Sequence, residues 1–422
     1  MRRRASLAMA STASGGVGLL AIAWLATRRL SSAEMGFFFS FLSFGALVQL
    51  ADFGLSYAAL QTAGQLAGTG RLHELPALSA RVWRWNVVTA SLASLVVAGI
   101  GWMTFSSHGS ALTASAVGWG RPWAAFVASV FLNQLTTPGI SLREGGGKVT
   151  QMWRLRLAQE WAAGLACLLV LHLGGGLWSL SAFASARAIV AGTWLTLGDP
   201  IATKPGGKAY SSKRWMAEVW PFQWKVGLSG LSGFLIFRAF APLILLERGP
   251  VMAGRFGLTI SLMNLLISVS TAWPLSQAAR FASLMAARRL AELRREFPVL
   301  LGASTAMAAA AAVVSALSLW QLHEKGFGFA LRLTDPVTTA VFLGTAVVHH
   351  VVGCFAVLLR AEGREPLLGV SVVGAVVNAV AILLAARYGS PVGIALANLA
   401  CAASGLLVTL YIAWRRWGGL RP

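Results

Sequence analysis

Charged residues are scarce in this chain of 422 residues, and acidic residues are the scarcest among them. Aspartate and glutamate together number 14, lysine and arginine number 35, and all charged residues make up only 12% of the sequence. Soluble domains carry roughly 25% charged residues. Hydrophobic residues make up 56% of this chain, and the mean hydropathy is +0.68. The composition therefore excludes an ordinary soluble domain and indicates a polytopic membrane protein.

Cysteines and catalytic patterns are also lacking. The three cysteines, Cys167, Cys354 and Cys401, fall in apolar segments, so no disulfide framework is predicted. The acidic residues are scattered singly, and the sequence contains no Gly-rich phosphate-binding loop of the Walker type. We therefore expect neither an enzyme, such as a membrane glycosyltransferase or polymerase, nor direct use of ATP. No catalytic residue, cofactor or metal site is predicted.

Apolar stretches long enough to cross a bilayer recur along the whole chain. A hydrocarbon core of about 30 Å requires about 20 apolar residues in a helix, and in lipid the backbone groups must be satisfied within that helix. The sequence therefore predicts an all-α integral membrane protein with about twelve transmembrane helices, at 8–26, 37–60, 85–104, 122–141, 157–173, 177–197, 219–246, 252–278, 299–321, 337–359, 367–386 and 391–413.

The cationic residues follow this predicted topology. With the N-terminus in the cytoplasm, 24 of the 35 lysines and arginines fall in cytoplasmic loops, eight in outer loops and three within spans. This bias satisfies the positive-inside rule, predicts that both termini are cytoplasmic, and accounts for the net charge of +21 without nucleic-acid binding. The basic start resembles a signal peptide, but the apolar run continues to Ala26, which favours an uncleaved first span. We expect the connectors at 61–84 and 280–295 to lie along the anionic leaflet.

The chain contains an internal duplication. Gly36, in the sequence SAEMGFF at 32–38, corresponds to Gly254, in VMAGRFG at 251–257, at an offset of 218 residues. The sequences LREG at 142–145 and LRAEG at 359–363 match at offsets of 217 and 218. Two six-helix lobes, 1–214 and 215–422, are therefore predicted, with the same orientation and a pseudo-two-fold axis along the membrane normal. In such folds the substrate path runs between the lobes.

Several of these sequences resemble those of a known family. The sequences TRRLSSAEMG at 27–36, LADFGL at 50–55, GPVMAGRF at 249–256 and LRAEGREP at 359–366 are similar to structural signatures of polysaccharide flippases. These flippases are the O-antigen and exopolysaccharide branch of the multidrug/oligosaccharidyl-lipid/polysaccharide exporter superfamily. The resemblance covers nearly the whole chain, but its motifs describe the fold better than the cargo.

The resemblance implies a function in polysaccharide biosynthesis. The cargo would be an undecaprenyl-pyrophosphate-linked oligosaccharide, which crosses the bacterial inner membrane by alternating access of the two lobes around a basic central cavity. Lipopolysaccharide or exopolysaccharide would be the product, and membrane lipid, a polysaccharide polymerase and assembly proteins would be partners. The alternative is a cation-coupled small-molecule or multidrug exporter of the same superfamily. An exporter of cations favours carboxylates in the membrane, whereas arginine and lysine predominate in these spans.

Three cations lie inside predicted spans, where a charge costs about 2.5 to 3.5 kcal/mol and therefore usually faces a bundle interior or a wet cavity. Arg187 lies near the middle of its span. A structural ion pair is the alternative to a cavity role for Arg187, but its nearest acidic neighbours in sequence, Glu160 and Asp199, are expected toward helix ends. Lys225 and Arg238 share the span 219–246 but lie about 220° apart around an ideal helix. Snorkelling of the side chain to the interface is the alternative for Lys225. The small residues between them, LSGLSG at 228–233, predict a kink or a close helix contact.

Other polar residues in spans are weaker candidates for substrate contact. Gln49 and Asp52 are three residues apart and would share a helical face, where they could bind a cation or a sugar hydroxyl; a capping role for Asp52 is the alternative. His349 and His350 are adjacent, so their side chains point about 100° apart and only one of them can face a lumen. A buried, hydrogen-bonded histidine is the alternative to a protonatable one. The predicted substrate-binding residues are thus Arg187, Arg238, Lys225, Asp52, Gln49, His349 and His350.

Overall fold

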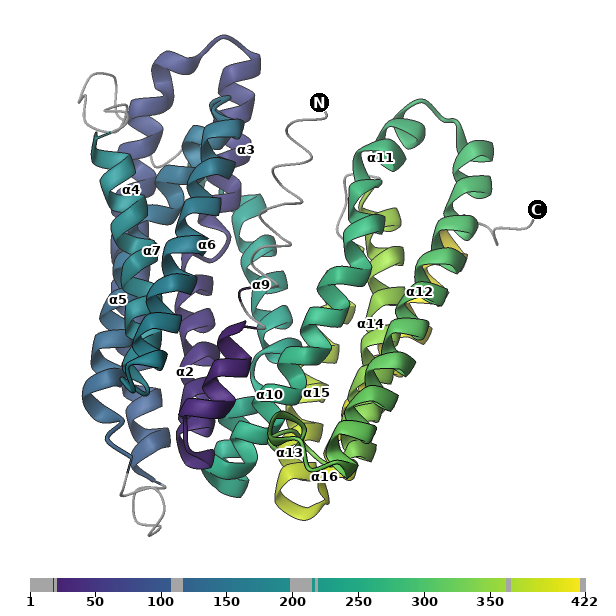
Figure 1. Cartoon of the computed structure of the whole chain (residues 1–422). Helices are drawn as coiled ribbons and strands as arrows, with labels where there is room; N and C mark the ends of the chain where they lie inside the picture. The colour runs from purple at the N-terminus through teal and green to yellow at the C-terminus, as the bar shows by residue number, and fades with distance from the viewer. Residues whose placement is uncertain are drawn as a thin grey trace. The chain divides into compact units, whose positions relative to one another are not determined.

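The computed structural model describes residue 18 and residues 21–107, 117–197, 215–216, 219–361 and 366–417. Helices dominate these residues and none of them forms a strand, which confirms the all-α prediction (Figure 1). Seven described stretches are long and apolar enough to cross a membrane: Leu72–Ser106, Trp178–Leu197, Gln223–Met285, Leu290–Glu324, Pro336–Arg360, Leu368–Tyr388 and Pro391–Arg416. The chain is therefore a multi-pass membrane protein.

The chain divides into two compact units. Unit 1 is Met1–Leu231 and unit 2 is Ser232–Pro422. The predicted lobe boundary between residues 214 and 215 adjoins residues 198–214, which lie outside the described part of the chain, and it stays a prediction. Each unit is described separately below.

Unit 1 is built around α5. Its elements are a helix over 21–29, α2 (Ser32–Gln49), the 3-10 turn η1 (Leu50–Asp52), α3 (Leu55–Gly68), the 3-10 turn η2 (Leu72–Glu74), α4 (Leu75–Ser106), α5 (Gly120–Gly145), α6 (Val149–His172), α7 (Trp178–Leu197) and the first part of α9 (Trp220–Phe237). Helix α5 packs against α3, α4 and α7, and α6 packs against α7.

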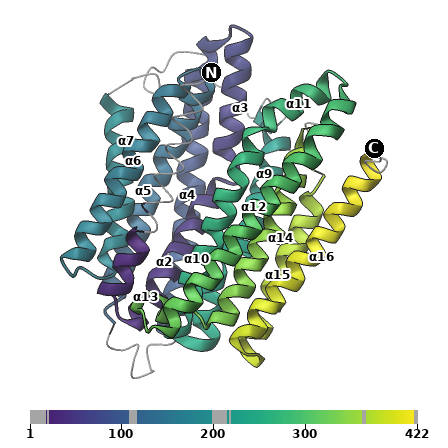
Figure 2. The same ribbon diagram turned by 45° about the vertical axis from the view of Figure 1, so that its right-hand side comes forward.

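Unit 2 repeats this arrangement around α14. Its elements are the end of α9, α10 (Phe240–Ser276), α11 (Ala278–Ala286), α12 (Leu290–Glu324), α13 (Gly328–Leu331), α14 (Pro336–Arg360), α15 (Leu368–Tyr388) and α16 (Pro391–Trp417). Helix α14 packs against α10, α12 and α16, and α15 packs against α16. Figure 2 shows α12, α14, α15 and α16 as long neighbouring helices. The same order of packing in both units confirms the predicted duplication into two six-helix lobes.

The predicted span 37–60 is not one continuous helix. Helix α2 starts with a capping box, in which Ser31 and Glu34 each accept a hydrogen bond from the other's backbone N–H, and it ends at Gln49. After η1, Phe53 and Gly54 have φ values of 48° and 81°, which place both in the left-handed region. This conformation favours glycine and interrupts the helix before α3 begins. The sequence FG therefore marks a helix break within the predicted span.

The small residues at 228–233 produce a close contact rather than a kink. Helix α9 runs unbroken from Trp220 to Phe237. A Cβ atom on Gly227 would lie 2.5 Å from the Phe53 ring, and one on Gly230 would lie 3.0 Å from Leu50 Cδ2. The breaks in this part of the chain fall later, at residues 238–239 and at Gly249, which has φ 78° and ψ 178° directly before Pro250.

An aromatic cluster fills one end of unit 1 between α2, α4 and α5. Its members are Phe37, Phe41, Phe44, Trp102, Phe105, Trp119, Trp123 and Phe126. Ring centroids lie 4.9 Å apart for Phe41 and Trp123. A Cβ atom on Gly101 would lie 2.3 Å from the Trp123 ring, so glycine is needed there to admit the indole.

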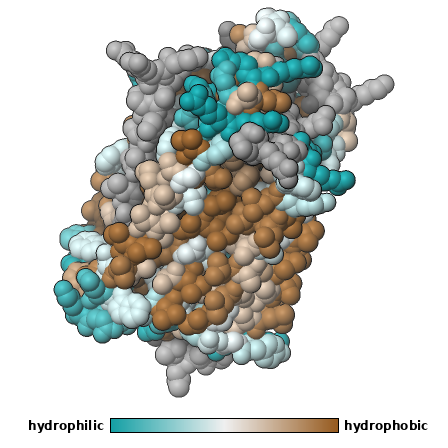
Figure 3. All heavy atoms as spheres, turned by 90° about the vertical axis from the view of Figure 1, so that its right-hand side faces the viewer, coloured by the Kyte–Doolittle hydropathy of each residue, from teal (hydrophilic) through white to brown (hydrophobic). Residues whose placement is uncertain are grey.

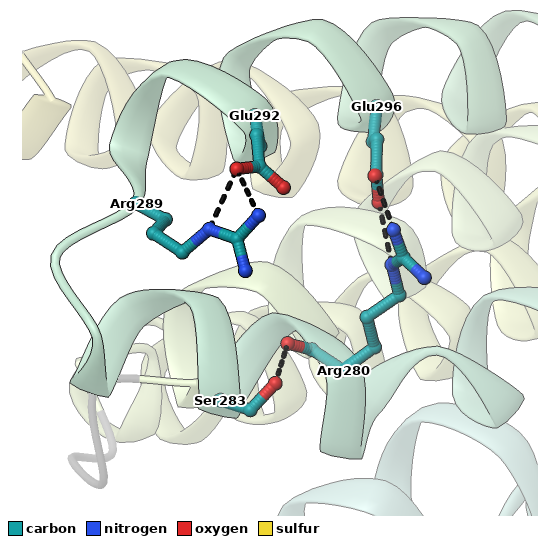
Figure 4. Close-up of polar contacts among 5 residues, drawn as sticks. All are labelled: Arg280, Ser283, Arg289, Glu292 and Glu296. Atoms are coloured by element: carbon teal, nitrogen blue, oxygen red, sulfur yellow. Dashed lines mark hydrogen bonds and ion pairs between the residues drawn. The ribbon is translucent and has the colours of Figure 1, made fainter.

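Unit 2 carries a folded hairpin of α11 and the first turns of α12. Phe281 and Leu284 of α11 are buried against Phe297 and Leu358, within a larger apolar core. Arg280 forms hydrogen bonds with both carboxylate oxygens of Glu296, and Arg289 pairs with Glu292 (Figure 4). The expectation that this connector lies along the lipid leaflet was therefore wrong for its apolar face, because that face packs against the protein.

Apolar side chains cover much of the outside of unit 2. Figure 3 shows hydrophobic residues across the middle of one face and hydrophilic residues toward its ends. Exposed members include Val313 and Leu317 of α12, Val377 of α15 and Leu407 of α16. Such a continuous apolar surface is unfavourable in water and matches the hydrocarbon core of a bilayer.

Candidate functional site

Two ion pairs connect α5, α6 and α7 in unit 1. Arg156 Nη2 of α6 donates to Glu144 Oε2 of α5 at 2.7 Å. One turn further along α6, Glu160 Oε1 lies 3.1 Å from Arg187 Nη2 of α7. Because residues four apart share a helix face, Arg156 and Glu160 project from the same side of α6. Glu144, Arg156, Glu160 and Arg187 thus form a line of alternating charge, the charged ladder, which runs from the end of α5 to the middle of α7.

The backbone of Arg187 is held by a hydrogen bond, but its guanidinium is incompletely paired. Gln159 Nε2 donates to the Arg187 backbone carbonyl at 3.0 Å, and the guanidinium carbon lies 5.9 Å from the centre of the Phe183 ring. The Arg187 side chain is 29% exposed, but its Nε atom is buried without a hydrogen-bond partner. The placement of Glu160 toward a helix end was wrong, because α6 begins at Val149 and Glu160 lies near its middle. Asp199 lies outside the described residues.

Lys225 lies near the start of α9 in unit 1. Its side chain is exposed, and its Nζ atom lies 5.8 Å from the centre of the Trp224 ring. No carboxylate lies within ion-pair distance of Lys225 among the residues that the structure describes. An ammonium group in an apolar span without a counter-ion is available to an external anion.

Asp52 and Gln49 lie at the break between α2 and α3. Asp52 Oδ1 accepts from the Gly54 N–H at 2.9 Å, and Oδ2 accepts from the Ser56 N–H at 3.1 Å. These hydrogen bonds satisfy backbone donors at the start of α3, as an N-cap residue does. Gln49 is the exposed last residue of α2. The helix ends between the two residues, so the continuous α-helical face that was expected to carry them is absent.

Arg238 and His349 lie in one neighbourhood of unit 2. Arg238 is exposed and directly follows α9, at the break before α10. The preceding residue, Phe237, has its ring centroid 4.8 Å from that of His349, and its carbonyl accepts from Asn264 Nδ2 at 3.2 Å. His349 Nε2 is buried without a partner. Asn264 and His349 thus support the break that presents Arg238.

His350 points elsewhere, as expected for the residue adjacent to His349. Its Nε2 atom lies 3.1 Å from Ser304 Oγ of α12 and 3.5 Å from Cys354 Sγ. The side chain is fully buried between α12 and α14. Its surroundings match the alternative of a buried histidine that makes a hydrogen bond between helices.

Almost all described carboxylates are engaged locally. Three act as caps or turn acceptors at helix starts, and five pair with arginine; the eight are Glu34, Asp52 and Asp335, then Glu74, Glu144, Glu160, Glu292 and Glu296. Among the described residues, only Glu247 and Glu324 lack such a partner, and both lie near helix ends rather than at the middle of a span. The spans therefore offer cationic groups to a ligand more readily than carboxylates.

Sequence reasoning missed two members of the charged ladder and set aside a third. Arg156 lies just before the predicted span 157–173, and Glu144 was assigned no role. Glu160 was considered as a neighbour of Arg187 but was expected too close to a helix end. The signal that would have found them is the spacing of Arg156 and Glu160, four residues apart on a helix that continues into an apolar run.

A small pocket of about 200 Å³ in unit 2, lined by Trp320, His323 and Thr334 among others, contains none of the predicted residues.

The comparison with known proteins places this geometry in a known architecture. No protein-family model and no curated protein matches the chain. Among solved structures, an inward-facing multidrug resistance MATE family transporter of the MOP superfamily has a TM-score of 0.70 at 13% identity, covering 96% of this chain and 95% of the other. The chain has the MOP transporter fold.

Two further structures extend this finding. The lipid II flippase MurJ, in an inward closed conformation, has a TM-score of 0.63 at 11% identity, with 98% of this chain and 87% of the other covered. A MOP superfamily transporter from Pyrococcus furiosus, described as having a binding pocket of reverse polarity, has a TM-score of 0.58 at 12% identity, with 98% and 95% covered. At these identities the likeness establishes the MOP fold and leaves the cargo to the residues of this chain.

Proposed function

We propose that this chain is a flippase for an anionic, lipid-linked oligosaccharide, and that the anionic group is the pyrophosphate of an undecaprenyl carrier. The observation that carries the proposal is the sign of the available charge. Lys225 and Arg238 lie in spans and are exposed, whereas the described carboxylates of the spans are engaged in caps and ion pairs. Arginine and lysine are the side chains that bind phosphate groups.

The proposed cycle follows from two lobes of the MOP fold. The pyrophosphate would bind cationic groups of the spans while the lipid tail stays in the bilayer, and rocking of the lobes would expose the bound headgroup to the other leaflet. We further propose that the protein lies in the bacterial inner membrane, with both termini cytoplasmic, in agreement with the positive-inside bias. Polysaccharide polymerase and assembly proteins are its proposed partners.

Export of small cationic molecules is the second candidate. It is favoured by the MATE structure, which matches with a higher TM-score than the flippase. The two functions require opposite charges in the binding region. The positive charge of Lys225 and Arg238 that attracts a pyrophosphate would repel a cationic drug. They can therefore be separated by one genetic experiment.

That experiment compares lipid extracts of cells with and without this protein by mass spectrometry. We expect an undecaprenyl-pyrophosphate oligosaccharide to accumulate in its absence, in a pool protected from a membrane-impermeant reagent outside the cell. Wild-type protein should reverse the accumulation, and Arg187→Ala should not, at equal protein level. Arg154→Ala, an exposed arginine on the same part of α6, is the matched control and should restore transport. An unchanged lipid pool together with loss of dye export would favour the second candidate.

A further inference from the structure

The ion pair of Glu160 and Arg187 differs from the other pair of the charged ladder. Glu144 is 14% exposed and its contact with Arg156 is 2.7 Å, whereas Glu160 is 27% exposed and its contact with Arg187 is 3.1 Å. The two arginines are similarly exposed, at 32% for Arg156 and 29% for Arg187. The Glu160 pair is therefore the longer of the two, and its carboxylate is the more accessible.

The Glu160 pair also leaves much of the guanidinium unused. A guanidinium offers five N–H donors in a fork that suits bidentate binding of a carboxylate or phosphate. The closest atoms of Glu160 and Arg187 are Oε1 and Nη2, 3.1 Å apart, and Arg187 Nε is buried without a partner. An unpaired buried donor is costly, and an anion that could reach it would recover that cost.

The backbone around Arg187 is fixed independently of Glu160. Gln159 holds the Arg187 carbonyl, and Ala184 and Ala188 pack on the buried side of α7. The guanidinium can therefore exchange one acceptor for another while the helix stays in place. An oligophosphate has more acceptor oxygens and more charge than a carboxylate, so it can displace Glu160.

We propose that Glu160 is a displaceable counter-ion, which positions the Arg187 guanidinium and screens its charge until a pyrophosphate headgroup replaces it. Glu160 is a positioning residue in this scheme, and Arg187 contacts the headgroup. The inference rests on the proposed function and adds to it a residue with the same sign of charge as the cargo. It explains how the charge of Arg187 stays compensated in the membrane during the part of the transport cycle in which no substrate is bound.

The test is binding of farnesyl pyrophosphate to the purified full-length protein in nanodiscs, measured by isothermal titration calorimetry. Removing the competing carboxylate in Glu160→Gln should tighten binding about threefold, the effect expected for one accessible ion pair. Arg187→Gln should weaken binding at least tenfold. Glu296→Gln, which breaks an ion pair in the hairpin of unit 2, is the matched control and should leave the affinity unchanged.

The reversed pair Glu160→Arg with Arg187→Glu separates positioning from support of the fold. If the ion pair only supports the fold, its reversal should restore both the unfolding midpoint and the affinity. Our scheme predicts a restored midpoint with weak binding, because the cation has moved from α7 to α6. Weaker or unchanged binding by Glu160→Gln overturns the counter-ion role alone. Failure of the wild type and all variants to bind farnesyl pyrophosphate overturns the proposed function as well.

Discussion

The two units repeat one order of helices but use different polar chemistry. In unit 1 the contacts between α5, α6 and α7 include the two ion pairs of the charged ladder, beside neutral contacts such as Ser129 with Ser185. In unit 2 the ion pairs among the described residues are confined to the α11–α12 hairpin, and the longer helices make contacts such as Asn398 with Asn378 at 3.0 Å and His350 with Ser304 at 3.1 Å. Duplication thus preserved the packing of the helices, which depends on shape, while the polar interior diverged.

The space around the glycines also differs between the two units. Several glycines of unit 1, including Gly45, Gly101 and Gly145, lie where an added Cβ atom would come within 3.0 Å of a neighbour. In unit 2 Gly302, Gly344, Gly374 and Gly405 have open space around the same position. Unit 1 therefore depends on close approach of its helices, and unit 2 has more tolerance to substitution.

The largest expected effect tests this difference in helix packing between the two units. A Cβ atom on Gly145 would lie 2.2 Å from the Leu60 carbonyl oxygen, so Gly145→Ala must separate α3 from α5. We expect a loss of about 2 kcal/mol in the free energy of unfolding, as for other overpacked sites. Gly374→Ala in unit 2 is the matched control and should be neutral or stabilising by up to about 1 kcal/mol. Thermal unfolding followed by far-ultraviolet circular dichroism measures both; equal midpoints would refute the difference between the units.

The second prediction tests whether the charge of Asp52 matters or only its hydrogen bonds. Asp52→Ala removes the acceptor for the Gly54 and Ser56 N–H groups and should cost about 1 kcal/mol. Asp52→Asn keeps one of the two acceptor oxygens, so it should retain part of the stability and the transport of lipid-linked oligosaccharide. Transport that is lost in Asp52→Asn while the unfolding midpoint is kept would indicate a role for the carboxylate charge.

The third prediction concerns the stability that a hydrogen bond between two neutral side chains gives to unit 2. Asn398→Ala leaves the buried Asn378 amide without its partner and should cost about 0.6 kcal/mol, the average for such contacts between membrane helices. The double variant with Asn378→Ala should cost less than the sum of the two single variants, because one contact is removed twice. Strict additivity of the three unfolding midpoints would show that the amides do not stabilise each other.

The smallest effect concerns charge on the surface of unit 2. Arg280→Gln breaks the exposed pair with Glu296 in the α11–α12 hairpin (Figure 4). We expect only a slight decrease of the unfolding midpoint, which disappears at about 1 M salt because the Debye length then falls to about 3 Å. A decrease that persists at this salt concentration would point to packing of the Arg280 side chain rather than to its charge.

The sequence was sufficient to predict the all-α fold and the duplication because both depend on patterns that many residues share. Apolar stretches fix the number of spans, and two pairs of matching motifs revealed the repeat. The breaks were harder to predict. Phe53 lies within an apolar run, and the helix is interrupted there by the left-handed conformation of Phe53 and Gly54 and by the hydrogen bonds of Asp52.

The candidate site was predicted less completely than the fold. Arg187 was found because a single arginine in an apolar span is conspicuous, but its partner Glu160 comes from another helix. The contact depends on how α6 and α7 pack, which the spacing of residues along the chain does not specify. The substrate-binding roles of all seven residues stay predictions. The contacts of Asp52 and His350, and the ion pair of Arg187 with Glu160, match their structural alternatives.

The aromatic cluster of unit 1 has a practical consequence. Trp102 and Trp119 lie with ring centroids 4.9 Å apart and steeply inclined planes, and Trp119 and Trp123 both contact Phe105. Indoles held this close in a fixed, chiral arrangement couple their electronic transitions and produce a strong near-ultraviolet circular dichroism signal. Because the members of the cluster all belong to one unit, the coupled part of this signal comes from the packing of that unit. The chain thus contains an optical label that needs no added dye.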